Sequence, residues 1–154
     1  MEQGNLQPQF GIERIYLKDI SFQVCNAPEV YSDSRRYDVG LNINSASRQI
    51  TAELFEVVLT VVATAKQGET EVFKGVVAEG GSFVIRNVKL DQRDAILGVA
   101  CPNILLPYAR EMLADLSTRA GFSPVMIQPV DFEAVFLQQR EQTRQQAAHG
   151  VPLQ

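Results

Sequence analysis

The side chains that most often perform catalysis are scarce and scattered in this sequence. The single histidine, His149, lies near the C-terminal end in a polar segment, and Cys25 and Cys101 are far apart without a CxxC pair. A Ser-His-Asp triad, a histidine base and a histidine-containing metal site all need a histidine beside other reactive groups. We therefore predict no catalytic set, no metal, no cofactor and two unreactive thiols.

Paired carboxylates could serve acid–base chemistry, and the sequence has two such pairs. Glu69 and Glu71 flank a predicted turn, while Asp131 and Glu133 open a predicted helix, so solvation and helix capping account for both. The Gly80-Gly81 pair lacks the GxGxxG or GxxxxGK context of a phosphate loop, and it is interpreted as the end of a strand. These patterns predict that the protein is not an enzyme.

Apolar side chains, by contrast, are concentrated around two predicted helix starts and the segment between them. Core packing accounts for most of them by default, but such a connector on a rigid scaffold can also line a groove for extended chains. The candidate groove comprises Pro102, Ile104, Leu105, Leu106, Phe122, Pro124, Val125, Ile127, Pro129, Phe132 and Phe136.

Composition limits the class of protein that can present these side chains. A chain of 154 residues with 45% hydrophobic and 21% charged residues predicts one globular domain. The net charge is −4 and the basic residues are spread along the chain, which argues against a nucleic-acid partner. No signal peptide and no long apolar run are present, so we predict a soluble, cytoplasmic protein without membrane insertion.

The first strand signal, residues 10–24, has an alternation whose parity changes twice. Phe10 and Ile12 are even, Ile15 and Leu17 are odd, and Ile20 begins an even series again. Because strand side chains change face at every residue, each parity change needs an inserted residue. We predict β-bulges near residues 13–14 and 18–19.

Three further segments predict strands and together an antiparallel meander. Residues 38–44 alternate, residues 53–65 give the strongest strand signal, and residues 66–69 form a turn into a strand at 72–78. Leu54, Val58 and Val62 leave the second face of the strongest strand apolar. Such a face predicts an oligomer, with a sheet from another copy stacked on it.

The pattern becomes helical after the strands. Residues 95–100 predict a short helical turn, Cys101-Pro102 a break, and residues 107–120 a helix with Gly121 in the left-handed position after its end. A second helix is predicted from Asp131, with its end fraying past Leu137.

This pattern also divides the chain into three parts. We predict a disordered N-terminus at residues 1–9, one domain at 10–137 and a polar flexible tail at 138–154.

The segment CPNILLPYARE, residues 101–111, resembles the signature of the SecB family of protein-export chaperones. Further similar segments follow in the family's order over roughly residues 10–137: Ile15-Tyr16, Lys18-Asp19-Ile20-Ser21-Phe22, Asn26-Ala27-Pro28, Phe55-Glu56-Val57-Val58-Leu59, Gly80-Gly81 with Phe83, and Pro129-Val130-Asp131-Phe132 with Phe136. Several motifs in one order are far more specific than any one of them.

The resemblance implies an α+β fold: a four-stranded antiparallel sheet with two helices packed on one face, assembling as a homotetrameric dimer of dimers. It implies a cytoplasmic, ATP-independent holdase that binds unfolded preproteins, keeps them export-competent and delivers them to the SecA motor ATPase. A holdase lowers the concentration of free, aggregation-prone chain by binding it.

The same resemblance implies two further surfaces. The motor-docking face would include Asp19, which matches the family, together with Gln23, Lys74 and Val76, which replace a carboxylate, a leucine and a carboxylate. The loss of two acids and the gain of a lysine predict weaker attraction to a basic motor. The oligomer interface would include Leu54, Val58, Val62, Tyr108, Met112 and Leu116.

Two other functions remain open at this point. The same apolar residues could enclose a pocket at the helix–sheet junction of a carrier for a small apolar ligand. An enzyme that uses Glu and Asp alone is least favoured, because no constellation of residues supports it.

Overall fold

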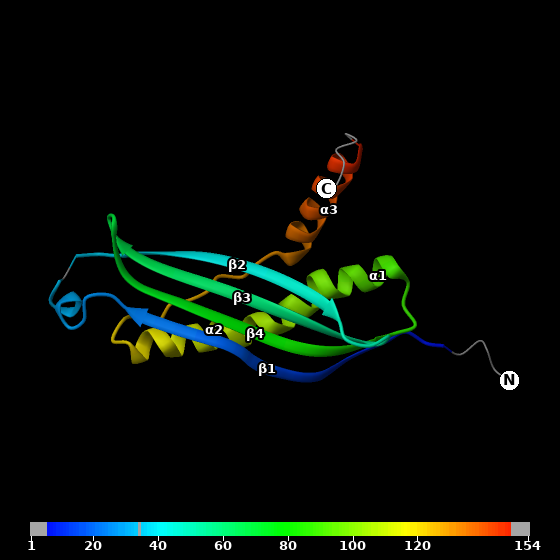
Figure 1. The fold of residues 1–154 in the computed structure, drawn as a ribbon, viewed down its shortest axis with the longest axis horizontal. Helices are drawn as coiled ribbons and strands as arrows, with labels where there is room; N and C mark the ends of the chain where they lie inside the picture. The colour runs from blue at the N-terminus through cyan, green and yellow to red at the C-terminus, as the bar shows by residue number, and fades with distance from the viewer. Residues whose placement is uncertain (1–5, 34, 149–154) are drawn as a thin grey trace.

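A computed structural model describes residues 6–33 and 35–148, and they form one antiparallel sheet with a helical layer. Its strands are β1 (Gln9–Val24), β2 (Asp38–Gln49), β3 (Leu54–Gln67) and β4 (Thr70–Arg86) (Figure 1). Their order in the sheet is β1-β4-β3-β2, so only the last three strands form the predicted meander. The first strand crosses over to pair with β4, which leaves β1 and β2 as the edges.

Both predicted bulges in β1 are confirmed. The register against β4 shifts between Ile12 and Arg14 and again between Leu17 and Asp19. The extra residue at each point restores the alternation, so every large apolar side chain of β1 pairs with a β4 residue that faces the helices. Polar residues such as Arg14, Asp19 and Gln23 consequently face the other side, which we call the outer face.

The prediction that Gly80-Gly81 ends the fourth strand is wrong, since β4 continues to Arg86. A Cβ atom on Gly80 would lie 2.6 Å from the Tyr16 ring, and one on Gly81 would lie 2.8 Å from the Phe83 ring. The two glycines therefore admit a ring on each face of a continuous strand.

The helical layer is one long run rather than two helices separated by a break. The helix α1 (Leu90–Ala95) continues through a π-helical segment, Ile96–Ala100, into α2 (Cys101–Arg119). The predicted break at Cys101-Pro102 is wrong, because Pro102 occupies the first turn of α2, where a missing N–H costs little. Pro107 lies inside the helix instead of starting it. Gly121 has a φ of 93°, as the left-handed position after a helix end requires.

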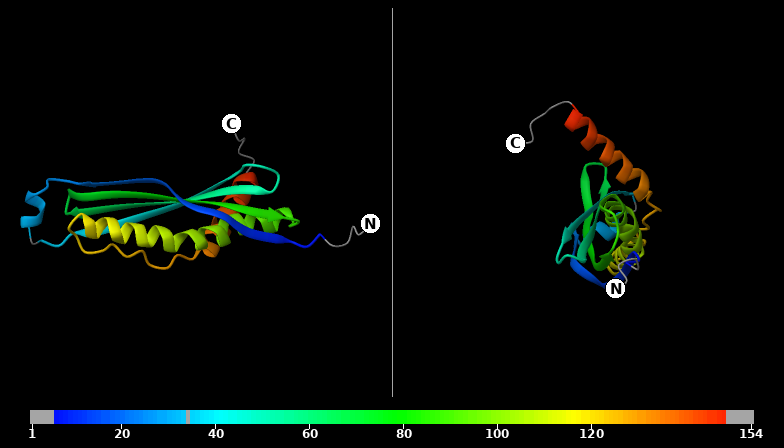
Figure 2. Two further views of the ribbon diagram at one scale, coloured as in Figure 1. Left: turned by 90° about the horizontal axis from the view of Figure 1, so that it is seen from below. Right: turned by 90° about the vertical axis from the view of Figure 1, so that its right-hand side faces the viewer.

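The connector, residues 120–131, runs back along α2 and leads into α3 (Phe132–Ala148) (Figure 2). The Asp131 side chain accepts the N–H of Ala134 at 3.0 Å, which confirms it as the N-cap. Only Phe132 of α3 is buried, and the helix projects away from the sheet while continuing past Leu137 to Ala148. The second helix therefore contacts the layer through its first turns, and His149 lies outside the described residues.

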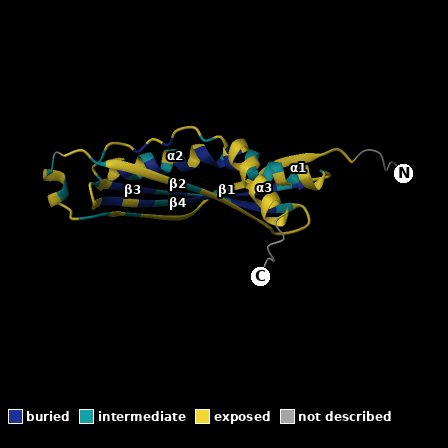
Figure 3. Cartoon of the chain, turned by 90° about the horizontal axis from the view of Figure 1, so that it is seen from above, coloured by how far each residue is buried: buried dark blue, intermediate teal, exposed yellow. Residues whose placement is uncertain are grey.

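The core lies between α2 and the middle strands β3 and β4 (Figure 3). Phe73, Phe83, Leu59, Leu105 and Leu113 are fully buried there. Because these side chains fill the helix–sheet junction, the space that a carrier would need for an enclosed ligand is occupied by the protein's own core.

Candidate functional site

The predicted groove residues separate into two groups in the structure. Pro102, Leu105, Leu106, Val125, Ile127 and Phe132 are buried, with Leu105 at 0%, Ile127 at 3% and Phe132 at 5% exposure. These six side chains pack mainly in the core, although Phe132 and Val125 also line hollows at its surface. Ile104, Phe122 and Phe136 are half-buried, and Pro124 and Pro129 are exposed.

Two hydrogen bonds hold the connector in this orientation. The buried Ser117 hydroxyl accepts the N–H of Val125 at 2.9 Å, and the Arg110 side chain donates to the carbonyl of Ile127 at 2.8 Å. Both partners belong to α2, so the connector is fixed along that helix with its alternate side chains turned inward. The neighbouring residues Pro124 and Met126 are exposed and face outward.

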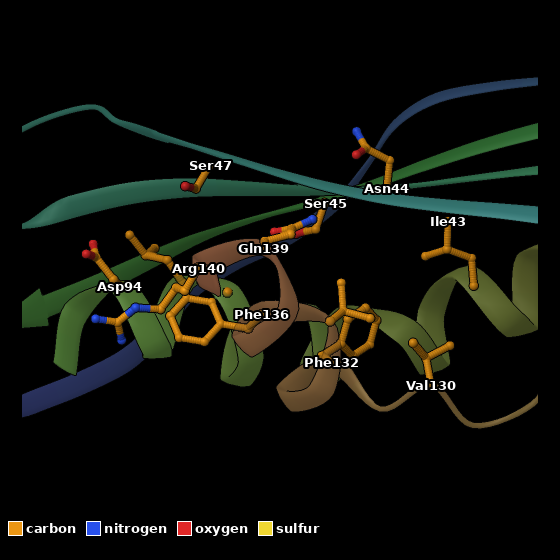
Figure 4. Close-up of a pocket in the computed structure, with 13 residues that line it drawn as sticks. Ile43, Asn44, Ser45, Ser47, Asp94, Val130, Phe132, Phe136, Gln139 and Arg140 are labelled. Carbon is orange, nitrogen blue, oxygen red and sulfur yellow. The ribbon is translucent and has the colours of Figure 1, made fainter. Parts of the chain in front are cut away.

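A hollow of about 360 Å³ lies between β2 and α3 (Figure 4). One wall is formed by the β2 strand, with Ile43 and Ser45 pointing toward α3 and Val130. The other wall carries apolar side chains next to polar ones: Phe132, Val135 and Phe136, followed by Gln139 and Arg140. The hollow can therefore accept an apolar side chain beside hydrogen-bonding groups.

The contact of Phe136 with Gly98 sets the position of α3. A Cβ atom on Gly98 would lie 2.5 Å from the Phe136 ring, so only glycine allows the ring to approach the π-helical segment this closely. The Arg140 guanidinium lies 5.5 Å from the centre of the same ring. Phe136 thus anchors α3 while leaving part of its ring in the hollow.

Two more hollows follow this one, the first beside β2 and the second just past the start of that strand. The first, of about 520 Å³, lies between Val39 and Leu41 of β2 and Pro124 to Met126 of the connector. The second, of about 210 Å³, is bounded by Tyr37, Tyr31 and Phe122. From the first hollow to the third, the residue numbers decrease along both walls. The three hollows therefore form one line, which we call the β2 groove.

Aromatic rings form the far end of the β2 groove. The Phe122 ring centre lies 4.8 Å from that of Phe73 and 5.5 Å from that of Tyr31. The Tyr31 hydroxyl donates to the carbonyl of Ala120 at 2.7 Å, which ties the short 3-10 helix Glu29–Ser32 to the end of α2. This end of the groove is consequently a fixed aromatic surface.

The β2 backbone is the second feature of the groove. Among the described strands β2 pairs with β3 alone, so the opposite edge of β2 has peptide groups without a strand partner. An extended chain could pair with such an edge while its alternate side chains enter the hollows.

Sequence reasoning missed the contribution of β2 and of the π-helical segment. Ser45 and Ser47 lie beyond the predicted end of the strand, because their short polar side chains broke the apolar alternation. Gly98 carried a usable signal, since a glycine within a helical pattern often marks a close approach. Leu97, Asp94 and Gln139 had no signal that could assign them to a groove.

The outer face of the sheet has polar rows that alternate with apolar ones. Leu54, Val58 and Val62 are half-buried and lie in separate rows, divided by the rows of Glu56 and Thr60. The outer face therefore alternates apolar and polar rows, and its part in an oligomer interface stays a prediction.

The four predicted motor-docking positions do share the outer face. Gln23 and Lys74 are cross-strand partners. Val76 pairs with Ser21, and Asp19 pairs with Ala78 two positions further along the same two strands. The crossover of β1 to β4 brings them together from distant parts of the sequence.

A charged cluster occupies the opposite half of the outer face. The Glu56 side chain accepts hydrogen bonds from the Tyr16 hydroxyl, from the Lys18 amine at 2.9 Å and from Arg48 at 2.9 Å. These donors lower the pKa of Glu56 to about 2, with the Tyr16 bond first among the causes. Burial and the bond to Glu56 raise the pKa of Tyr16 to about 12.

The helix side of the molecule has its own exposed apolar surface. Tyr108 is 48% exposed, while Met112 and Leu116 are half-buried. Because α2 lies across β3 and β4, several helix-facing side chains of β1 remain exposed at the edge, including Ile12 and Leu17. The two halves of the predicted oligomer interface thus lie on opposite sides of the protomer.

The described residues contain no group of three or more His, Cys, Asp or Glu side chains placed to bind a metal ion. Burial raises the pKa of the Cys101 thiol to about 12, so this thiol remains protonated and unreactive at neutral pH. Of the helices that the structure describes, none has both the length and the apolarity to cross a membrane.

Comparison with known proteins gives consistent results over nearly the whole chain. The family model of the preprotein translocase subunit SecB matches residues 3–143. The protein-export protein SecB of Chromobacterium violaceum is 50% identical over 141 residues, which cover 92% of this chain and 94% of that protein. The SecB of Dechloromonas aromatica is 46% identical over 154 residues, with 100% of both chains covered.

A solved structure shows a similar fold. It is the SecB-like chaperone of Mycobacterium tuberculosis in complex with a ChAD peptide from the HigA1 antitoxin, with a TM-score of 0.65 and 19% sequence identity over 79% of this chain and 90% of that one. At this identity the likeness concerns the fold alone. Together, the family model and the full-length relatives show that the chain belongs to the SecB family.

Proposed function

We propose that this protein is an ATP-independent holdase that binds unfolded preproteins in the cytoplasm and keeps them competent for export. The observation that carries the proposal is the β2 groove, a line of three hollows beside an unpaired strand edge. The SecB family consists of chaperones, and the related Mycobacterium tuberculosis protein was solved with a bound peptide, which supports the same function here.

In the proposed mechanism an extended client segment lies along β2. Backbone pairing with the strand edge does not depend on the client sequence, while shallow hollows accept different apolar side chains. Arg140 and Gln139 at one end could bind client carbonyl groups. Binding removes apolar client surface from water, which accounts for holding without nucleotide hydrolysis.

The test compares two groove variants with a matched control. Val135→Asp and Met126→Asp place a charge at exposed groove positions that are 43% and 57% exposed, and Leu90→Asp makes the same change at a 64% exposed site outside the three hollows. We expect the two groove changes combined to weaken binding of a chemically unfolded preprotein by about tenfold. Leu90→Asp should change it by less than about twofold.

The measurement is suppression of preprotein aggregation without nucleotide, together with anisotropy of a labelled preprotein. Wild-type protein should suppress aggregation at a near-stoichiometric ratio of tetramer to client. Unaltered aggregation at excess protein, or equal losses for the groove and control variants, would contradict the proposal.

We propose further that the protein functions as a homotetramer. The apolar surface formed by Tyr108, Met112 and Leu116 with the uncovered side of β1 is the proposed interface, since the outer face has alternating polar rows. Native mass spectrometry should give four chains, and Met112→Asp should give smaller species.

Delivery to the SecA motor is proposed to use the half of the outer face around Asp19, Gln23, Lys74 and Val76. These four positions share one face, as a docking site requires. If the motor surface is basic, Lys74→Glu should strengthen SecA binding by several-fold in a titration of the two purified proteins.

A further inference from the structure

The second bulge of β1 brings two opposite charges onto the same face of the sheet. The register against β4 shifts between Leu17 and Asp19, so Lys18 is an inserted residue. Asp19 lies on the outer face, and the Lys18 side chain extends over that face as far as Glu56. An ammonium and a carboxylate on adjacent residues of one face attract each other, and such a pair would hide both charges from a partner.

Glu56 takes the Lys18 ammonium away from Asp19. The Lys18 Nζ donates to Glu56 Oε1 at 2.9 Å, although Glu56 belongs to β3 and the lysine must cross β4 to reach it. Asp19 is exposed, accepts the N–H of Ile20 at 2.9 Å and forms no ion pair within the described part of the chain. The fold therefore keeps one carboxylate unneutralised beside a lysine that is already paired.

Burial decides which carboxylate the lysine prefers. Glu56 is 5% exposed, and a buried charge without a partner is costly, whereas an exposed ion pair gains little over water. Tyr16 and Arg48 also donate to Glu56 and hold its carboxylate in place. Its donors, the Tyr16 hydroxyl first among them, lower the pKa of Glu56 to about 2, so the acceptor of Lys18 stays ionised throughout the neutral range.

Arg14 and Lys74, two other cations of the outer face, lie too far from Asp19 to take the place of Lys18. The β4 partner of Asp19 is four positions from Lys74 and four from the partner of Arg14, so both cations are about 13 Å away along the strand. This separation exceeds the Debye length of about 8 Å at physiological ionic strength. Lys18 is therefore better placed than either of them to neutralise Asp19.

We propose that Glu56 is a positioning residue for motor docking: it holds the Lys18 ammonium across β4 and leaves the Asp19 carboxylate free to accept a cation or an N–H donor of the motor. The inference rests on the proposed docking of SecA at this face. Asp19 is the only carboxylate among the four proposed docking positions. Its availability therefore matters more in this chain than it would on a face with several acids.

The test titrates fluorescein-labelled protein with purified SecA at about 150 mM salt and follows anisotropy. Glu56→Gln frees Lys18 to pair with Asp19, and SecA binding should weaken by about threefold, as expected for one exposed ion pair. Adding Lys18→Met removes the freed cation, which should restore affinity to within about 1.5-fold of wild type. A purely structural role for Glu56 predicts no such rescue, because the second change removes a further partner from the same cluster.

Glu56→Gln with Arg48→Met is the matched control. It has the same net charge as the rescued variant and also removes one donor of Glu56, but Arg48 lies on β2, three strand spacings or about 14 Å from β1. SecA binding should therefore stay about threefold weaker than that of wild type. Both double variants carry Glu56→Gln, so its cost in stability is common to them. Circular dichroism and suppression of preprotein aggregation should match between the two.

Asp19→Asn separates this inference from the docking proposal on which it rests. It should weaken SecA binding by about fivefold, and Glu56→Gln should then add less than about 1.5-fold, because no carboxylate remains to be neutralised. If Asp19→Asn binds SecA like wild type, the docking face is misplaced and the inference falls with it. If Asp19→Asn weakens binding but Glu56→Gln does not, or if Arg48→Met restores affinity as well as Lys18→Met does, the docking face stands and the role of Glu56 is overturned.

Discussion

Two carboxylates on neighbouring strands show how differently the two faces of the sheet treat a charge. Glu56 on the outer face and Glu79 on the helix-covered face are both 5% exposed. The pKa of Glu56 is lowered to about 2, while burial and the nearby Glu111 carboxylate raise that of Glu79. Donors decide the difference, because Glu56 accepts three side-chain hydrogen bonds and Glu79 accepts none within the described part of the chain.

Burial alone therefore does not fix the protonation state of a carboxylate in this sheet. The crossover of β1 brings Tyr16 and Lys18 to Glu56, and the β2 pairing brings Arg48. On the other face, Glu79 pairs with the apolar Leu59 and Leu17 under α2. The outer face is therefore built to hold charge, and the helix-covered face to exclude it.

The largest expected effect comes from removing the outer-face charge. Glu56→Gln should lower the free energy of unfolding at pH 7 by about 2 to 3 kcal/mol, since Lys18, Arg48 and Tyr16 lose a charged acceptor. Because the folded pKa is depressed, this contribution is present above the unfolded value of 4.5 and is lost as pH falls toward about 2.

Urea unfolding across this acid range measures the effect of Glu56→Gln. Glu53→Gln is the control, because Glu53 pairs with Arg86 while its side chain is 53% exposed, and it should cost less than about 0.5 kcal/mol. Equal costs for the two variants would mean that burial and the three donors of Glu56 add nothing.

The adjacent glycines Gly80 and Gly81 test how tightly each face of the sheet is packed. Gly81→Ala should cost about 2 kcal/mol, because its Cβ would meet the Phe83 ring and also Leu105 beneath α2. Gly80→Ala should cost about 1 kcal/mol, since the half-exposed Tyr16 ring can move outward. Thermal or urea unfolding of both variants gives the order, and a reversed order would show that the outer face is the more rigidly packed one.

The smallest expected effect has the opposite sign. Glu79→Gln should raise the free energy of unfolding at neutral pH by about 1 kcal/mol, because it removes a buried charge that lies near Glu111. Because the folded pKa of Glu79 is raised, the wild-type protein loses stability only as pH rises above the unfolded value of 4.5. In acid the Glu79 carboxyl group is protonated in both states, so the benefit of the variant should vanish there.

The control for this variant is Glu111→Gln, which should give a smaller gain because only the neighbouring charge is removed. Urea unfolding at neutral and acid pH measures both. If Glu79→Gln lowers stability, the Glu79 carboxylate has a stabilising donor in the folded protein and the contrast with Glu56 fails.

Local chemistry was enough to predict much of the fold. Parity changes in residues 10–24 located both bulges, and Asp131 and Gly121 marked a helix start and a helix end. These features depend on neighbours in sequence, which a pattern records directly. Pro102 misled the prediction, because a proline is equally compatible with a helix break and with the first turn of a helix.

The sequence by itself determined the four strand segments, the two bulges, the helix start at Asp131 and, through ordered motifs, the likeness to the SecB family. Only the tertiary structure decided which connector residues face the core, because Ser117 and Arg110 orient Val125 and Ile127 from another element. It also decided that β2 lies at an edge beside α3 and that Glu56 gains its donors from β1 and β2. Both outcomes depend on pairings between segments distant in sequence, which local patterns of side chains do not encode.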